Sequence, residues 1–411
     1  MLSKELNELL TRTGPGTPMG SFLRRYWLPA LLSEEIPAPD SPPVQVRLLG
    51  EELVAFRDSA GRIGLLEEHC LHRGTSLYYG RNEECGLRCI YHGWKYDVTG
   101  RVLDTPAEPA GSTFKDRLRH VAYPTHEAGG MIFAYLGPPD QQPLFPAYSW
   151  TQLGPEHTYV TKSLLECNYL QGLEGECDSS HLSFLHREMT SGERTQALLQ
   201  RDVAPAYQFE ETDFGVRLIA LRDAGDETYV RISSFVMPTH CWINGRVPEV
   251  HFYVPADDTH AWRYDLGMIP DRPVRPSDLH KAPEIGPDYR RKRNIDNHYL
   301  QDREKQRRED FTGIENFFVE DACATETQGP IWDRSCEHLG VSDRAVIVVR
   351  NMLVDAVQRF QAGHAPPHLV TDAARNHFAH VAAVQAVIPA ATDWHARFPE
   401  LVASAAQNGS R

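Results

Sequence analysis

Two pairs of metal-binding side chains lie close together in the first quarter of the chain. Cys70 and His72 form the first pair, and Cys89 and His92 form the second. Thiolate sulfur and imidazole nitrogen are ligands that proteins use for zinc and for iron–sulfur centres. Four such ligands in two close pairs predict one metal centre, held by residues 70–92.

The composition of each pair separates two kinds of centre. Zinc sites with two cysteines and two histidines usually place the cysteines in one pair, C-x₂₋₄-C, and the histidines in the other, H-x₃₋₅-H. Here each pair has one cysteine and one histidine, which suits a [2Fe–2S] cluster whose two thiolates hold one iron and whose two imidazoles hold the other. The sequence therefore favours a Rieske cluster, and a colourless, zinc-stabilised binding module is the alternative.

A second set of candidate ligands follows at residues 178–186. Asp178, His181 and His186 offer one carboxylate and two imidazoles. Two histidines and a carboxylate on one face of an iron ion leave positions open for O₂. Residues five apart on a straight helix diverge by roughly 140°. We therefore expect a break or a π-bulge between the two histidines.

A small all-β unit is expected to hold the first centre. Its strand-like segments are 44–49, 51–57, 62–66 and 129–137, with hairpin turns at 58–61 and within 95–105. The Pro-rich segment 137–150 is the expected linker to a second unit.

The second unit is expected to be mixed α+β. Residues 163–187 have helix-like apolar spacing, with Leu165, Tyr169 and Leu173 four apart, and 214–270 return to strand-like segments. The charged segment 287–310 is expected to form a solvated face. After an N-cap at Ser342-Asp343, a helix would carry one apolar face. Its residues are Val346, Val349, Leu353, Val357 and Phe360.

Bulk properties exclude several classes of protein. A chain of 411 residues suggests at least two domains, and a formal net charge of −14 argues against a nucleic-acid binder. The apolar runs are too short for a membrane span, and the N-terminus has no secretory h-region. The eight cysteines are therefore expected to be reduced thiols in the cytoplasm.

The two motifs together resemble the α-subunit of Rieske non-haem iron aromatic-ring-hydroxylating oxygenases, of the phthalate and phenoxybenzoate dioxygenase type. The resemblance spans nearly the whole chain. It is carried by "RTGPGTPMG" at 12–20, "YWLPALL" at 26–32, "HRG", "YHGWKYD", "NYLQGLEG" at 168–175 and the segment 310–343. It implies an α+β protein with a Rieske domain at 40–150 and a catalytic domain at 1–39 and 151–411. The catalytic domain would have an antiparallel sheet flanked by helices, in a helix-grip arrangement.

The resemblance also implies roles for matching residues. Cys70, His72, Cys89 and His92 would hold the [2Fe–2S] cluster. High-potential Rieske proteins join their cluster loops by a disulfide, but Thr75 and Tyr91 stand at the matching positions. The cluster therefore resembles the low-potential kind found in oxygenases.

For the mononuclear Fe(II), the resemblance implies His181, His186 and a carboxylate in "FFVEDACATETQGP". Asp321 is the preferred third ligand, with Glu320 and Glu326 as alternatives. Asp178 resembles the family's bridging aspartate instead.

That aspartate links an iron-ligand histidine, here His181, to a Rieske histidine of the neighbouring subunit, matching His92. It implies a homotrimer or a hexamer built as a dimer of trimers, and it would orient both imidazole rings.

The implied reaction uses O₂ and a small aromatic substrate. Electrons would come from a separate NADH-dependent reductase with flavin and iron–sulfur centres, because this chain has no G-x-G-x-x-G after a strand. An aromatic carboxylate would suit a bidentate arginine. Arg246 is the preferred anchor, and Ser179 is a second candidate pocket residue. The other candidate arginines are Arg201, Arg217, Arg222, Arg231 and Arg263.

Two alternative functions remain at this stage. The same machinery could act as a monooxygenase or O-demethylase of a methoxy- or aryloxy-substituted ring. A more distant alternative is a Rieske electron carrier, which would contain about two irons per chain rather than about three.

Overall fold

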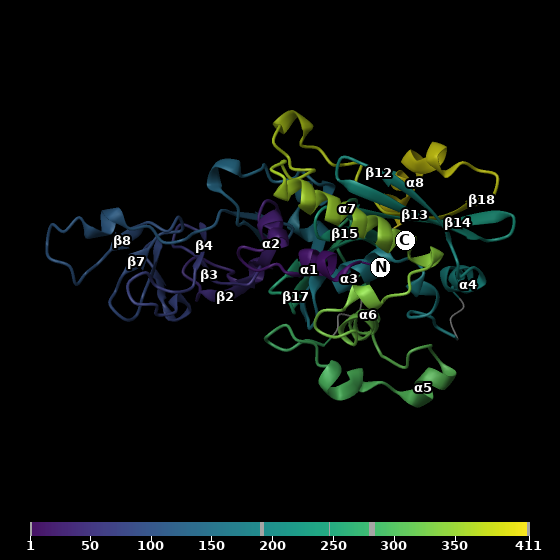
Figure 1. Cartoon of the computed structure of the whole chain (residues 1–411), viewed down its shortest axis with the longest axis horizontal. Coiled ribbons are helices and arrows are strands. Elements are labelled where there is room, and N and C mark those ends of the chain that lie inside the picture. Colours follow the sequence, from purple (N-terminus) through teal and green to yellow (C-terminus); the bar gives the residue numbers. More distant parts are fainter. Residues whose placement is uncertain (1, 190–192, 246, 279–283, 409–411) are drawn as a thin grey trace.

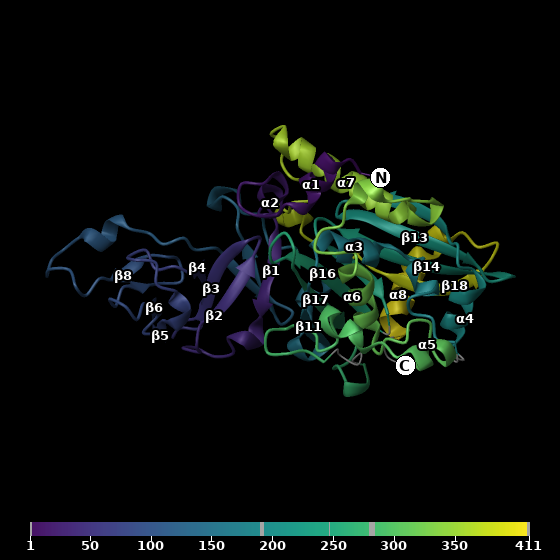
Figure 2. The same ribbon diagram turned by 60° about the horizontal axis from the view of Figure 1, so that its bottom comes forward.

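The computed structural model describes residues 2–189, 193–245, 247–278 and 284–408. Figures 1 and 2 show a narrow lobe made of strands β2–β8, joined to a larger body that contains the long helices and the main sheet. No helix in the described ranges combines the length and the apolar character that crossing a bilayer requires.

Short antiparallel strands build the narrow lobe, as expected. One sheet has the order β2 (Val44–Leu48), β3 (Glu51–Arg57), β4 (Ile63–Glu67), and a second has the order β5 (Arg81–Glu83), β6 (Gly86–Arg88), β7 (Lys95–Tyr96), β8 (Val102–Asp104). The predicted turn between β7 and β8 contains Gly100, whose φ is 79°. A Cβ there would lie 2.2 Å from the carbonyl oxygen of His120, so only glycine fits.

The narrow lobe has its own hydrophobic core, separate from that of the body. The two candidate cluster cysteines, Cys70 and Cys89, belong to this core, and both are buried. A third sheet, with the order β1 (Trp27–Leu32), β10 (Met131–Tyr135), β9 (Thr125–Ala128), packs against the body. The limits of the two domains stay a prediction.

The body is organised around an antiparallel sheet of eight strands. The order is β11-β17-β16-β15-β14-β13-β12, with β18 paired to β14. The strands are β11 (Thr158–Leu165), β12 (Ala206–Glu211), β13 (Gly215–Asp223), β14 (Glu227–Val236), β15 (His240–Asn244), β16 (Pro248–Pro255), β17 (Ala261–Met268) and β18 (Val384–Pro389).

Helices cover this sheet and position the site. They are α1 (Lys4–Thr11), α2 (Pro18–Leu23), α3 (Tyr169–Cys177), α4 (Arg194–Arg201), α5 (Arg303–Arg308), α6 (Phe317–Glu326), α7 (Arg344–Gln361) and α8 (Trp394–Asn408). Helix α3 packs on β15 and β16, and α6 and α7 pack on α3. An all-β N-terminal unit with a helix-covered antiparallel sheet after it confirms the predicted α+β fold class.

The apolar face of α7 is also confirmed. Val346, Val349, Leu353 and Val357 are buried, and Phe360 is half-buried against the same core. Asp343 occupies the N-cap position, but its carboxylate accepts from the Gly340 backbone instead of capping α7.

Two expectations about local structure were wrong in part. Residues 163–165 end β11 rather than begin a helix, because Asn168 caps α3 by accepting from the Leu170 N–H. The charged segment 287–310 is not wholly solvated, since Arg291 is buried and donates to Ser163 and to the Leu164 carbonyl.

Candidate metal centres and substrate cavity

The four candidate cluster ligands lie on two loops of matching construction. After Cys70 and after Cys89 the chain turns back, so that the N–H groups of Gly74 and Gly93 donate to the two cysteine carbonyls at 2.8 and 3.1 Å. Both glycines have positive φ, 71° and 74°. This conformation, which favours glycine, explains the "HRG" and "YHG" sequences beside the ligands.

The side chains on these loops place two thiols and two imidazoles together. The rings of His72 and His92 meet edge to face, with centroids 4.4 Å apart. The Nδ1 atom of each ring is buried and has no hydrogen-bond partner, which is costly unless the atom binds something else. Two buried thiols beside two such nitrogens fit a two-cysteine, two-histidine cluster. All eight cysteines, each within the described residues, are free thiols.

Tyr96 is a further group at this centre. Its hydroxyl lies 3.0 Å from Cys70 Sγ, and both residues are buried. A hydrogen bond to a cluster-ligand sulfur stabilises the more negative, reduced form of an iron–sulfur cluster.

We expect Tyr96→Phe to lower the reduction potential of the cluster by tens of millivolts, because one hydrogen bond is worth about 1 kcal/mol. A redox titration followed by visible circular dichroism measures the shift. Tyr78→Phe is the control, since Tyr78 is 39% exposed. An unchanged or higher potential in Tyr96→Phe would contradict this role.

A local break separates the two candidate histidines of the second centre. Helix α3 ends at Cys177, and Asp178 accepts from the backbone N–H groups of Ser180 and His181, at 2.7 and 3.2 Å. A single 3₁₀ turn follows, and the chain then becomes irregular before His186. The predicted break between the two histidines is therefore confirmed, but it is not a π-bulge: α3 ends before His181, and the 3₁₀ turn that begins at His181 ends at Ser183.

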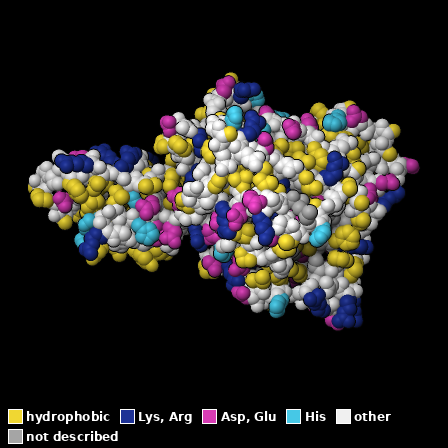
Figure 3. All heavy atoms as spheres, in the orientation of Figure 1, with side chains coloured by type: hydrophobic (Ala, Val, Ile, Leu, Met, Phe, Trp, Pro, Cys, Tyr) yellow, Lys and Arg dark blue, Asp and Glu magenta, His cyan; other side chains and the backbone are white. Residues whose placement is uncertain are grey.

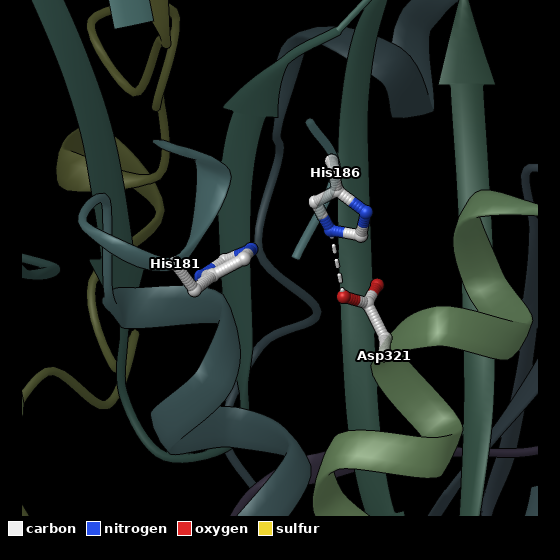
Figure 4. A group of neighbouring side chains, drawn as sticks. All are labelled: His181, His186 and Asp321. Carbon is white, nitrogen blue, oxygen red and sulfur yellow. Dashed lines mark hydrogen bonds and ion pairs between the residues drawn. The ribbon is translucent and has the colours of Figure 1, made fainter. Parts of the chain in front are cut away.

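His181, His186 and Asp321 converge although they come from different elements. One ligand atom from each lies within 4.8 Å of the others. Figure 4 shows Asp321, on α6, with one oxygen directed at the His186 ring and with His181 approaching from the other side. His186 Nε2 lies 3.0 Å from Asp321 Oδ1. Two imidazoles and one carboxylate this close fit a single metal ion.

The charges around this group suit a cation. Burial would raise the pKa of Asp321, but His186 and Arg263 hold it well below its usual range, so the carboxylate is ionised. Burial and the neighbouring His186 lower the pKa of His181, which keeps that ring neutral and able to bind a metal. Burial opposes protonation of His186 too, but Asp321 and Glu320 raise its pKa to about 9.

The two alternative third ligands lie elsewhere. Glu320 Oε2 is 2.7 Å from His186 Nδ1, on the far side of the ring from Asp321. It is therefore suited to orient the ring, as carboxylates behind metal-bound histidines do. Glu326 accepts from Tyr299 at 2.7 Å and faces Arg291, away from the histidines.

A cavity of about 410 Å³ opens beside the triad. His181, Asp321 and Asp178 line it. Phe317 also lines it, and its ring stacks on that of His186 with the ring centroids 3.6 Å apart. Much of the remaining wall is apolar. It includes Leu165, Leu182, Leu185, Ile243 and Val346. This volume lies in the range of small-molecule sites.

Two of the candidate arginines line the cavity, and Arg246 lies outside the described residues. Arg231, on β14, lines it and donates to the neutral amide oxygen of Gln385 at 3.0 Å. Arg263, on β17, is paired with Asp321 and Asp265.

The remaining candidate arginines, all within the described residues, do not line the cavity. Arg222 holds Ser179, a cavity-lining residue, by donating to its hydroxyl at 3.1 Å and to its carbonyl. Arg217 pairs with Glu210, and Arg201 is exposed.

Sequence reasoning missed a buried polar network behind the triad. Glu249 and His251 on β16, and Arg263 and Asp265 on β17, contact one another and Glu176 on α3. Burial opposes protonation of His251, but Glu176 and Asp265 raise its pKa to about 10. The sequence feature that could have revealed this network is the spacing of these residues, which stand two apart in two otherwise apolar strands. Residues two apart in a strand point to the same face of the sheet.

Comparison with known proteins agrees with both centres. Residues 26–121 match the Rieske [2Fe-2S] domain family, and residues 134–408 match the family described as "LigXa C-terminal domain like". The phthalate 4,5-dioxygenase oxygenase subunit of Pseudomonas putida is 42% identical over 385 residues, which is 88% of each chain. The tert-butanol monooxygenase / tert-amyl alcohol desaturase oxygenase subunit of Aquincola tertiaricarbonis is 36% identical and covers 87% of this chain and 77% of its own.

A solved structure has the same fold. The NdmA QL mutant of Pseudomonas putida CBB5 with theobromine aligns with a TM-score of 0.60 and 19% identity, over 85% of this chain and 98% of its own. The two matched families and the relatives at more than 30% identity show that this chain belongs to the Rieske non-haem iron oxygenase α-subunits, which carry a [2Fe–2S] cluster and a mononuclear iron.

Proposed function

We propose that this oxygenase hydroxylates an aromatic carboxylate of the phthalate or phenoxybenzoate kind. The observation that carries the proposal is the cavity, which has His181 and Asp321 in its wall together with Arg231. Its apolar lining suits a ring, and an arginine suits a carboxylate. The 42% identical relative is named a phthalate dioxygenase, which supports the same class of substrate.

The proposed ligands are Cys70, His72, Cys89 and His92 for the cluster, and His181, His186 and Asp321 for the iron. When bound, the cluster supplies single electrons and the iron activates O₂.

The chain's own residues supply position and charge. Glu320 orients the His186 ring, and Phe317 covers it. Arg231 and the Ser179 hydroxyl would hold the substrate carboxylate, so that the ring lies toward His181 and Asp321.

We further propose a homotrimer, alone or paired as a hexamer, fed by a separate NADH-dependent reductase. Within one subunit, strands β7 and β8 lie in the narrow lobe with the cluster loops, apart from α3 and α6 in the body (Figure 1). Leu71, Ile90 and Tyr91, which stand between the cluster ligands, are 40%, 59% and 54% exposed. Figure 3 shows hydrophobic side chains gathered on this lobe. Apolar surface beside the cluster ligands supports docking of these loops against another subunit, where His92 would meet Asp178.

The test of the reaction is a single turnover. The protein is reduced chemically, and one aromatic acid is added at a time. ¹⁸O₂ is then admitted, and the products are analysed by mass spectrometry. Two labelled oxygens in a cis-diol, or in the catechol formed from it, support dioxygenation. One labelled oxygen in a phenol, or loss of an aldehyde, supports the monooxygenase or O-demethylase alternative, which the 36% identical monooxygenase relative keeps open. Absence of product with every acid would overturn the proposed substrate class.

Arg231→Met is expected to raise KM for the acid substrate about 10- to 100-fold, because a charge-assisted hydrogen bond contributes about 1.5–3 kcal/mol. KM for the matching amide or ester should change little. Arg201→Met is the matched control, since Arg201 lies at the exposed end of α4. Equal KM values in Arg231→Met and the unsubstituted protein would remove Arg231 from the substrate site.

A further inference from the structure

Asp321 divides its two carboxylate oxygens between different partners. Oδ1 lies 3.0 Å from His186 Nε2, on the side of the histidines. Oδ2 accepts a hydrogen bond from a terminal nitrogen of Arg263 at 3.2 Å. Arg263 is 1% exposed and comes from β17, whereas Asp321 comes from α6, so this ion pair joins the sheet to the helix.

The guanidinium of Arg263 is itself fixed on several sides. Its Nε donates to Asp265 Oδ1 at 2.7 Å, and its second terminal nitrogen lies 3.9 Å from Glu176 Oε2. The rings of Tyr253 and Phe318 lie 5.5 and 4.9 Å from its central carbon. A planar fork held in this way keeps its direction, and it makes rotation of the Asp321 carboxylate costly.

The buried network behind the arginine supports this geometry. His251, which lies beside Arg263, is fixed by Glu176 at 2.8 Å and by Glu249 at 3.1 Å, and Glu176 also faces the Arg263 guanidinium. Tyr253 also donates to Glu176, at 2.7 Å. Glu176 belongs to α3. The network therefore connects this helix, which leads to His181, with β17, whose Arg263 holds Asp321.

We propose that Arg263 is a positioning residue that reserves Oδ2 of Asp321, so that the carboxylate offers a metal ion only Oδ1. This inference rests on the proposed function, in which Asp321 is an iron ligand. A one-oxygen ligand occupies one position on the metal rather than two. The position that a second oxygen would take is then left for another ligand, such as O₂.

The experiment compares two substitutions with a matched control. Arg263→Lys keeps the charge but loses the fork, and Arg263→Met removes both the charge and the donors. Arg334→Lys is the control, because Arg334 is also fully buried and paired with a carboxylate, that of Glu174, but does not contact the triad. Each protein is depleted of mononuclear iron, with its cluster retained, and is titrated with Fe(II) against a chelator. The nitric oxide adduct of the reloaded iron is then examined by electron paramagnetic resonance.

We expect the Kd for Fe(II) to rise about 10- to 100-fold in Arg263→Met, with a smaller rise in Arg263→Lys. The spectrum of the nitric oxide adduct should change in both, and Arg334→Lys should match the unsubstituted protein. Unchanged affinity and spectrum at position 263 would overturn the inference, as would an equal change in Arg334→Lys. If far-UV circular dichroism shows that Arg263→Met is misfolded, Arg263→Lys decides.

These measurements use no substrate, so they do not depend on which acid the enzyme takes. An unsubstituted protein that binds no mononuclear iron would refute the ligand set in the proposed function. An unsubstituted protein that binds iron, with variants that bind it equally well, would refute only the role of Arg263.

Discussion

Asp321→Ala is expected to reduce the iron content from about three to about two atoms per chain and to abolish oxygenation. The substitution removes the one carboxylate whose oxygen lies 3.0 Å from His186 Nε2. It also removes the negative charge that keeps a cation between two imidazoles. The cluster should be unaffected, because its ligands lie on the separate core of the narrow lobe. Metal analysis and the visible spectrum of the same sample measure both centres together.

The control for this result is Glu326→Gln. Glu326 is in the same helix and is buried, but its partners are Tyr299, Arg291 and the Glu166 backbone. It should keep three irons and most of the activity. Three irons in Asp321→Ala, or two in Glu326→Gln, would move the third ligand away from Asp321. Two irons in the unsubstituted protein would instead favour an electron carrier.

The cluster ligands could be predicted from the sequence because they are local. Cys70 and His72, and Cys89 and His92, lie within a few residues of each other, and each loop contains the glycine that lets it turn. Short-range spacing therefore contains most of the information about this centre. The break before His186 was predictable for the same reason, since five residues of straight helix cannot direct two rings at one point.

Long-range contacts account for what the sequence could not predict. Asp321 lies 135 residues from His186, and only the resemblance to a family selected it over Glu320. The roles of Glu320 behind His186 and of Arg263 behind Asp321 depend on how α6 packs on α3 and where this places it relative to β17, which no local pattern specifies. The helix-like spacing of 163–187 was wrong for residues 163–165, because their pairing with β17 outweighs an apolar spacing that suits either structure.

Asp178→Asn is expected to retain about three irons per chain yet to lower turnover about 100-fold or more. Asp178 stands at the end of α3, with Oδ2 3.9 Å from Nδ1 of His181, and that nitrogen is buried without a hydrogen-bond partner. Its side chain is 23% exposed, so it remains accessible from outside the subunit. A carboxylate can accept from two imidazole N–H groups and orient both, whereas an amide oxygen accepts more weakly and brings two competing donors.

The loss should therefore lie in the passage of electrons between subunits rather than in metal binding. Rapid mixing of the reduced protein with O₂ and substrate measures this directly, as slower reoxidation of the cluster at unchanged iron content. Asp302→Asn is the matched control, because Asp302 also accepts from two backbone N–H groups but caps the exposed helix α5. Full activity in Asp178→Asn would refute the bridge and with it the reason for a trimer. Loss of iron would show that Asp178 instead maintains the local turn that places His181.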